Sequence, residues 1–323
     1  MVDRDGDGPV GDKASTSRSG RGRMMERAIA VPVLRATRPT FLSLTPVCVL
    51  IGIGAAVQTR THVSVADSLL VLMGALLAHV SVNLLNEYDD FRSGLDSLTE
   101  RTPFSGGSGS LPAHPEAAAA TLIWGLLCLA VTAVIGLYFL YEKGLALLPL
   151  GLAGLILVAA YTPLVTRQPL LCLFAPGLGF GPLMVVGTAF ALSGHYSWIA
   201  MTASLAPLFL VSELLLINQF PDIDADRQVG RRHLPIILGR RRSALLFGIL
   251  VISAFGAIVV SDVAGGLPAL ALLGLLPLPL GMYLARQVYV YADDVPRLIP
   301  YMGMNVAMIH VTLLFVAIAL LFG

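Results

Sequence analysis

Long runs of apolar residues recur along the whole chain and leave few segments that could form the surface of a soluble fold. Of the 323 residues, 56% are hydrophobic and only 13% are charged, against about 25% charged residues in a typical soluble domain. A run of about 20 apolar residues crosses the bilayer core as a helix. The chain is therefore predicted to be an all-α polytopic membrane protein whose helices surround a central cavity.

Nine membrane-spanning helices fit the apolar runs at this length. They are expected at roughly 40–58, 65–88, 118–140, 144–163, 170–192, 196–219, 242–262, 266–290 and 300–322. Residues 31–323 would form one transmembrane domain. Residues 1–30, rich in Gly, Ser, Asp and Arg, are predicted to be a disordered cytoplasmic tail because they contain too little apolar surface to fold.

The distribution of positive charge predicts how the helices are oriented. Of the 21 Lys and Arg residues, 19 lie in the amino tail or in the segments that follow even-numbered spans, and the other two are Arg60 and Lys143. Lys and Arg concentrate in cytoplasmic loops of membrane proteins. We therefore expect an integral protein of the cytoplasmic membrane, with its amino terminus and polar loops in the cytoplasm and its carboxyl terminus outside.

Two polar segments, each of which closes an apolar run, interrupt this pattern. The first is Asn86–Asp96, after the second span, and the second is Asn218–Arg227, after the sixth. Each opens with Asn and has Asp four residues later, so on a helix the two side chains lie on one face. Because the second and sixth spans point the same way, both segments should emerge in the cytoplasm and face one another. This arrangement is consistent with a faint repeat of four helices.

The oxygen-rich side chains of these two segments predict binding sites for divalent cations. Clustered carboxylates repel one another, and Mg²⁺ favours carboxylates together with substrate phosphates. The predicted metal ligands are Asn86, Asp90, Asp96, Asn218, Asp222 and Asp226. The four Asp residues among them are also the predicted catalytic residues. A bridging diphosphate would need further donors and positive charge, for which the candidates are Asn83, Asn86, Arg101, Asn218, Arg227, Arg231 and Arg232.

Other polar residues allow both a functional and a structural interpretation. The loop Ser105-Gly-Gly-Ser-Gly109 could bind phosphate through backbone N–H groups, or it could be a plain flexible loop. It is not a Walker loop, because no Gly-Lys-Ser/Thr follows. Ionisable residues inside membrane spans are functional candidates, but packing or an interhelical hydrogen bond explains His79, Glu213 and His310 equally well.

The two motifs resemble those of the UbiA-type intramembrane prenyltransferases, which carry an Asn/Asp-rich motif after helix 2 and another after helix 6. The resemblance begins at Arg35-Ala-Thr-Arg-Pro39. It is strongest for the branch that prenylates 1,4-dihydroxy-2-naphthoate, through Asn86-xxx-Asp90-xxxxx-Asp96 and Asn218-xxx-Asp222-xxx-Asp226-Arg227. Glu87 departs from the Asp that often stands there. The family's Tyr-xxx-Lys after the fourth span is also altered, and the resemblance implies Arg167 as the replacement for that Lys in diphosphate binding.

The resemblance implies an Mg²⁺-dependent transfer of a polyprenyl group from its diphosphate to an aromatic acceptor, 1,4-dihydroxy-2-naphthoate in menaquinone biosynthesis. A prenyl carbocation requires a dry, apolar pocket, which a membrane bundle provides. The implied partners are a polyprenyl diphosphate, a small aromatic acceptor and the lipid bilayer, with no nucleic acid and no protein partner inferred. Three alternatives stay open: another acceptor, such as 4-hydroxybenzoate, another phenol or a glycerol phosphate lipid; a terpene cyclase of the same fold; and a membrane transporter.

Overall fold

The computed structural model describes residues 29–59 and 62–323 as helices and their connections, with no strand among them. Eight of the described helices are long and apolar enough to cross a membrane, and one further apolar helix is shorter. The prediction of an all-α membrane bundle is therefore confirmed. The predicted disordered tail, residues 1–30, lies outside the described residues except for its last two.

Most of the predicted spans coincide with single long helices. These are α2 (Leu44–Gln58), preceded by η1 (Phe41–Ser43), then α3 (Val65–Ser93), α5 (Ala118–Lys143), α13 (Arg240–Val263) and α15 (Val295–Phe322). In α3, Ser64 caps the first turn by accepting the N–H of Asp67, as hydroxyls at helix starts commonly do. The helix ends where Gly94 adopts a left-handed φ of 78°, which glycine adopts without steric cost.

Three other spans are interrupted. The fifth consists of α7 (Pro169–Leu178), the π-helical segment η6 (Gly179–Val186) and α8 (Gly187–Ser193). The sixth consists of α9 (Trp198–Ala203) and α10 (Leu205–Asn218), and the eighth of η7 (Ala269–Leu275) and α14 (Leu278–Val290). Proline lacks a backbone N–H and crowds the preceding turn, and Pro182 lies within η6.

The predicted fourth span is shorter than expected. Instead of 144–163, the apolar helix covers Leu145–Ala160, as η4 (Leu145–Leu147) and α6 (Leu148–Ala160). It falls short of the roughly 20 residues of a full crossing, yet its length of about 24 Å still carries the chain across most of the bundle. The chain then turns through residues 161–164 into η5 (Val165–Arg167).

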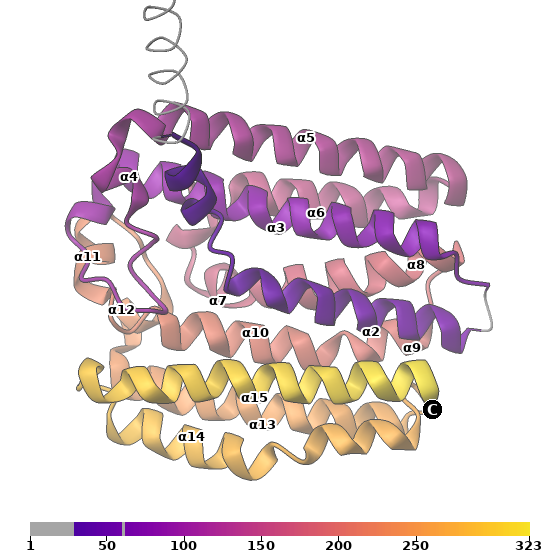
Figure 1. Ribbon diagram of the computed structural model, residues 1–323. Coiled ribbons are helices and arrows are strands. Elements are labelled where there is room, and N and C mark those ends of the chain that lie inside the picture. The colour runs from indigo at the N-terminus through magenta and orange to yellow at the C-terminus, as the bar shows by residue number, and fades with distance from the viewer. Residues whose placement is uncertain (1–28, 60–61) are drawn as a thin grey trace, which may run out of the picture.

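The helices run side by side, and the polar connections gather at one end of the bundle (Figure 1). The short helices α4 (Ser110–Ala113), α11 (Ile223–Gln228) and α12 (Leu234–Leu238) lie at this polar end. The carboxyl terminus lies at the opposite end. Both motif segments thus emerge on the same side, which is the relation that the sequence predicts.

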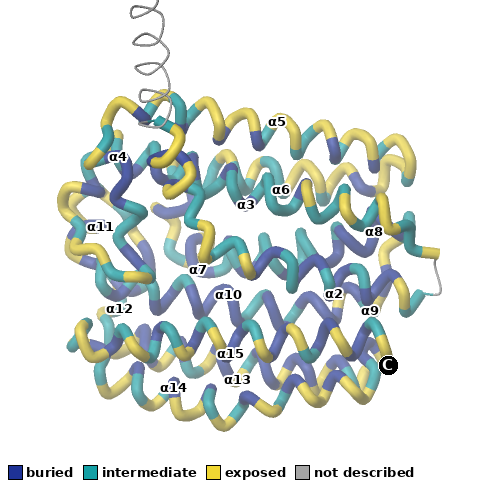
Figure 2. The backbone as a smooth tube through the Cα atoms, viewed as in Figure 1, coloured by how far each residue is buried: buried dark blue, intermediate teal, exposed yellow. Residues whose placement is uncertain are grey.

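Burial is concentrated in the middle of the bundle, whereas the outer faces of α5 and α14 are largely exposed (Figure 2). The main core is built on α10, α13 and α15 and includes Phe220 and Phe247. Helices in lipid associate through close packing of small residues. A Cβ atom on Gly52 of α2 would lie 2.5 Å from the Cβ of Thr188, and one on Gly54 would lie 2.6 Å from that of Leu320. These glycines let α2 approach α8 and α15.

The charge distribution and the position of the polar end together give a testable orientation. Cysteines introduced at the exposed residues Glu100 and Gln228, both at the polar end, should react with a membrane-impermeant thiol reagent only from the cytoplasmic side. A cysteine at the exposed Glu142, in the last turn of α5 at the opposite end of the bundle, should react only from outside. The native Cys48, Cys128 and Cys172 are buried and provide the unreactive background. Labelling of Glu100→Cys from outside intact cells would show that the orientation is reversed.

Candidate active site

A cavity of about 700 Å³ begins at the polar end and extends between the helices. Its walls are mainly apolar side chains of α3, α5, α6, α7 and η6. The polar side chains that line its mouth include Arg38, Asn83, Asn86, Asp90, Asp96, Asn218, Asp222, Asp226, Arg231 and His233. The structure therefore brings all six predicted metal ligands to one cavity.

The first motif lies on the last turns of α3. Asn83, Asn86 and Asp90 are helical and all three line the cavity, so the predicted shared face is present. Asn86 is already engaged on both sides, since its amide nitrogen donates to the Thr162 hydroxyl at 3.1 Å and its oxygen accepts from Arg38 at 3.4 Å. Asp96 follows in η2 (Leu95–Ser97) and is buried.

The second motif reaches the cavity by a different route from the one predicted. A continuous helix through Asn218 and Asp222 is wrong, because α10 ends at Asn218 and the chain turns before α11 begins at Ile223. Pro221 lies in this turn, and proline disfavours a helical conformation in the residue before it. Asp222 is the residue just before α11, and its side chain makes no capping hydrogen bond. Asp226 lies one turn later, where its N–H donates to the Asp222 carbonyl at 2.8 Å.

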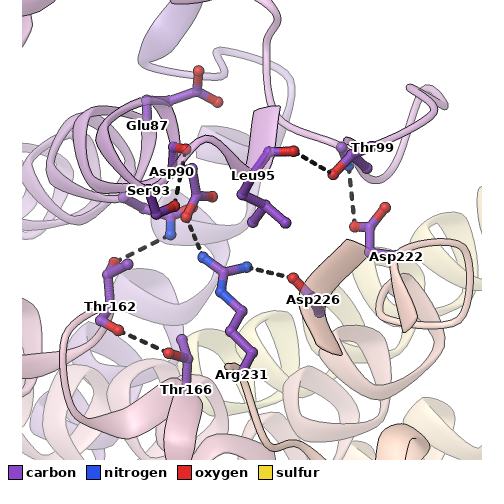
Figure 3. A network of polar contacts seen from close by, with 12 residues as sticks. Glu87, Asp90, Ser93, Leu95, Thr99, Thr162, Thr166, Asp222, Asp226 and Arg231 are labelled. Atoms are coloured by element: carbon purple, nitrogen blue, oxygen red, sulfur yellow. Dashed lines mark hydrogen bonds and ion pairs between the residues drawn. The ribbon is translucent and has the colours of Figure 1, made fainter. Parts of the chain in front are cut away.

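Arg231 connects the two motifs. Figure 3 shows its guanidinium extended between Asp90 of the first motif and Asp226 of the second. It forms an ion pair with Asp90, and its Nη1 lies 3.0 Å from Asp226 Oδ1. The other oxygen of Asp226 lies 2.8 Å from His233 Nε2. Buried charges are stable only when they are paired and hydrogen-bonded, and this network satisfies both carboxylates.

A second buried network is centred on Glu87, which is fully buried on α3. Glu87 Oε1 accepts from Arg38 Nε at 2.9 Å and from the Ser108 N–H at 2.7 Å, and Oε2 accepts from the Ser108 hydroxyl at 2.8 Å. Arg38 has a φ of 51°, the one positive φ among the described non-glycine residues, at a cost of about 1–2 kcal/mol. The ion pair with Glu87 fixes the Arg38 side chain at the mouth of the cavity.

The Gly/Ser loop closes over the mouth and joins both motifs. Gly106 and Gly107 have left-handed φ values of 78° and 70°, which other residues adopt with strain. The Gly106 N–H donates to Asp222 Oδ2 at 3.2 Å. A Cβ atom on Gly107 would lie 2.9 Å from Asp96 Oδ1, so glycine is needed to let the loop approach that carboxylate. The loop is thus an ordered part of the site.

The carboxylates fit divalent cations only together with a ligand that supplies further oxygens. Among residues 29–59 and 62–323, no three Asp, Glu, His or Cys side chains converge into a ready-made metal cluster. Three buried side-chain oxygens of the two motifs nevertheless have no hydrogen-bond partner in the described chain: Asp96 Oδ2, Asn218 Oδ1 and Asp222 Oδ1. One or two protein carboxylates completed by phosphate oxygens and water is the coordination typical of Mg²⁺.

Four predicted diphosphate-binding residues do not line the cavity. Exposed positions outside it are occupied by Arg101, Arg167, Arg227 and Arg232. Arg227 instead pairs with the exposed Asp224 at 3.6 Å. Of the five arginines predicted to bind diphosphate, the structure brings Arg231 to the cavity, and a diphosphate role for the other four stays a prediction.

Sequence reasoning missed three residues of the site: Arg38, Glu87 as its partner, and His233. Arg38 precedes Pro39 at the start of the first span, far in sequence from either motif, so spacing alone does not place it there. His233 follows Arg231 and Arg232 in the second polar loop. A His seven residues after Asp226, in the same polar loop, is the signal in the sequence that indicates His233.

Two carboxyl groups at the mouth have unusual acidities. Burial, together with the nearby Glu87 and Asp90 carboxylates, raises the pKa of Asp96 to about 7. Burial, together with the Asp226 carboxylate, raises the pKa of Asp222 to about 7. The ordinary pKa of Asp is about 4. Both groups therefore retain protons near neutral pH until positive charge arrives nearby.

These pKa shifts predict how stability depends on pH. Between about pH 4 and pH 7 the folded state holds more protons on Asp96 and Asp222 than the unfolded chain, so the free energy of unfolding falls as pH rises through this window. In detergent without divalent cations, Tm should be higher at pH 5.5 than at pH 7.5. Asp222→Asn should reduce this difference, whereas Asp224→Asn, at an exposed position of the same segment, should leave it unchanged. A pH dependence as large in Asp222→Asn as in the unaltered protein would contradict the assignment of Asp222 as one of the two shifted groups.

The sequence is similar to that of the 1,4-dihydroxy-2-naphthoate octaprenyltransferase of Bacillus subtilis (strain 168). The two sequences are 28% identical over 213 residues, which cover 65% of this chain and 67% of that protein. A relation at this level is consistent with the resemblance seen in the two motifs.

Solved structures share the fold. A digeranylgeranylglyceryl phosphate synthase superposes with a TM-score of 0.64 at 14% identity, covering 91% of this chain and 99% of that one. A UbiA homologue from Archaeoglobus fulgidus, bound to DMAPP and Mg²⁺, gives a TM-score of 0.59 at 13% identity, covering 88% and 99%. The model of the UbiA prenyltransferase family matches residues 45–309, which include both motifs and the Gly/Ser loop, and the chain therefore belongs to the UbiA prenyltransferase family.

Proposed function

We propose that this prenyltransferase transfers a polyprenyl group from its diphosphate to 1,4-dihydroxy-2-naphthoate, with Mg²⁺ as cofactor, in menaquinone biosynthesis. The observation that carries the proposal is a single cavity with carboxylates of both motifs at its mouth and apolar walls beyond. Such a cavity suits a substrate that is charged at one end and a hydrocarbon along its length. The Archaeoglobus fulgidus homologue, which binds DMAPP and Mg²⁺, supports this choice of ligands.

In this proposal the side chains at the mouth hold the diphosphate and stabilise its departure. When bound, Mg²⁺ would neutralise negative charge that develops on the leaving diphosphate. Asp90, Asp96, Asp222 and Asp226 would hold the cations, together with the Asn86 and Asn218 oxygens. Arg231 and Arg38 already lie at the mouth and would contribute hydrogen bonds to phosphate oxygens. Asn83, Arg101, Arg167, Arg227 and Arg232 remain proposed diphosphate contacts.

The apolar part of the cavity would protect the reacting carbon from water. Phe41, Phe104, Phe139 and Phe180 are among its lining residues, and aromatic faces attract positive charge. A prenyl cation formed by ionisation would thus meet the acceptor ring before it met water. We further propose that the domain covers residues 31–323 in the cytoplasmic membrane, with the mouth of the cavity facing the cytoplasm, from which soluble substrates would enter.

The choice of acceptor rests on the naphthoate motif pattern and on the relative from Bacillus subtilis. The structurally similar synthase named for digeranylgeranylglyceryl phosphate makes a glycerol phosphate lipid the main alternative acceptor. A terpene cyclase with this fold would need no acceptor. A transporter is not supported, since the chain belongs to a family of prenyltransferases.

If both motifs hold the cations, neither motif alone should support catalysis. Asp90→Ala and Asp222→Ala should each lower kcat at least about 10³-fold, because each removes charge that positions the leaving diphosphate. EDTA should abolish activity of the unaltered enzyme and Mg²⁺ should restore it. Asp224→Ala is the matched control, because Asp224 belongs to the second motif but is exposed and does not line the cavity. Full turnover in EDTA would refute a role for divalent cations.

The acceptor can be tested by direct competition. Purified enzyme given Mg²⁺, a long-chain prenyl diphosphate, 1,4-dihydroxy-2-naphthoate and 4-hydroxybenzoate should prenylate the naphthoate with loss of its carboxylate. Mass spectrometry of the products and measurement of CO₂ identify the reaction. A glycerol phosphate acceptor and an acceptor-free reaction are run in parallel. Transfer to either other acceptor with no naphthoate product, or an acceptor-free cyclic terpene, would overturn the choice while leaving the family assignment intact.

A further inference from the structure

His79 lies on the cavity-facing side of α3, deeper than either motif. It shares the face that carries Asn83, Asn86 and Asp90, since these residues follow at helical spacings of four, seven and eleven, and all four line the cavity. At 1.5 Å per residue, His79 lies about 16 Å along the helix from Asp90 and about 6 Å beyond Asn83. This places its ring where the polar mouth gives way to the apolar interior.

The His79 ring is held in place on two sides. Its Nδ1 lies 2.8 Å from the hydroxyl of Thr45 on α2, and its edge packs against Phe180 of η6 with ring centroids 5.0 Å apart. Within the described chain, Nε2 has no hydrogen-bond partner, and the ring lines the cavity. A histidine whose one nitrogen is fixed by a neighbour offers the other nitrogen in a defined orientation.

No other imidazole or carboxyl group among the described cavity-lining residues lies this deep. The others belong to the mouth: Asp90, Asp96, Asp222, Asp226 and His233. Those groups are adjacent to the proposed diphosphate. Asp90 and Asp226 pair with Arg231, His233 contacts Asp226, and Asp222 accepts from the Gly106 N–H. An acceptor ring that attacks the prenyl carbon has to lie on the inner side of the diphosphate, between the mouth and His79.

We propose that His79 is a catalytic residue that binds a hydroxyl group of the aromatic acceptor through Nε2 and takes its proton during transfer. The inference rests on the proposed function, because it requires an acceptor that carries a phenolic hydroxyl. With Nδ1–H donated to Thr45, the lone pair of Nε2 faces the hydroxyl. Removal of the hydroxyl proton pushes electron density into the ring and makes the ring carbon a better nucleophile.

In the naphthoate reaction, His79 accepts the hydroxyl proton of the acceptor and later returns it. The prenyl C–O bond breaks with its electron pair leaving on diphosphate. The ring carbon that carries the carboxylate forms the new C–C bond while the O–H proton moves to Nε2, which leaves a ring ketone. The C–C bond to the carboxylate then breaks, CO₂ departs and the electron pair restores the aromatic ring as an oxyanion. The imidazolium returns its proton to that oxygen, so no proton is gained or lost overall.

The test compares acceptor chemistry with diphosphate chemistry in the same preparations. His79→Ala should lower kcat for transfer by about 10²–10⁴-fold, the usual contribution of a positioned general base. The KM for prenyl diphosphate and the slow acceptor-free release of diphosphate should not change, since the mouth of the cavity is intact. His79→Gln, whose side-chain amide can hold the hydroxyl but cannot take its proton, should keep the acceptor KM near that of the parent while kcat stays low.

A second histidine provides a matched control. His310 is also inside a membrane helix, and its Nε2 lies 3.0 Å from the hydroxyl of Ser43, but it does not line the cavity. His310→Gln should transfer at the rate of the parent enzyme. Thr45→Val should cause a partial loss, because Nδ1 loses its partner while Nε2 remains.

The outcomes separate this inference from the proposed function. If the unaltered enzyme prenylates the naphthoate and His79→Ala does so equally fast, His79 has no catalytic role and the function stands. Equal losses of transfer, prenyl diphosphate affinity and acceptor-free release in both His79 variants would show a structural role and also overturn the inference. If the unaltered enzyme prenylates no phenolic acceptor, the acceptor competition described above refutes the proposed function itself.

Discussion

The neutralisation of carboxylates at the end of an apolar bundle is the constraint on which the rest of this structure depends. Glu87, Asp90 and Asp226 are buried, and leaving a buried charge without its partner costs about 3–5 kcal/mol. Arg231 pairs with Asp90 and Asp226, and Arg38 pairs with Glu87. These pairs join α3, the segment after α10 and the start of the first span. The groups that hold the polar end together are therefore the groups that an anionic substrate would meet in the proposed function.

The order of the helices and the position of most spans could be predicted from the sequence because apolar length directly reflects bilayer thickness. The first motif was also predictable, since it continues a helix whose periodicity fixes the shared face of Asn86 and Asp90. The second motif was not, because the turn after Asn218 depends on local backbone geometry. The partners of Glu87 could not be inferred either. Arg38 is 49 residues away, and only the packing of the helices brings the two together.

The cavity explains why one fold can separate the two halves of the reaction. In the proposed reaction, charged groups at its mouth would hold the part of the substrate that must leave, while apolar and aromatic walls would surround the part that must react. The cation site is incomplete in the protein alone, since no three acidic or imidazole groups of the described chain converge. Cation and diphosphate should therefore bind together, which limits ionisation to the moment when the prenyl chain already lies in the dry interior.

The central claim is that both motifs hold the same cation–diphosphate complex, and binding of Mn²⁺ measures this directly. Mn²⁺ replaces Mg²⁺ at oxygen-rich sites, and electron paramagnetic resonance distinguishes bound from free ion. With an unreactive prenyl thiodiphosphate present, the purified protein should bind Mn²⁺ tightly, and either Asp90→Asn or Asp222→Asn alone should abolish tight binding. Tight binding that persists when one motif is altered, or that needs no diphosphate, would contradict the account.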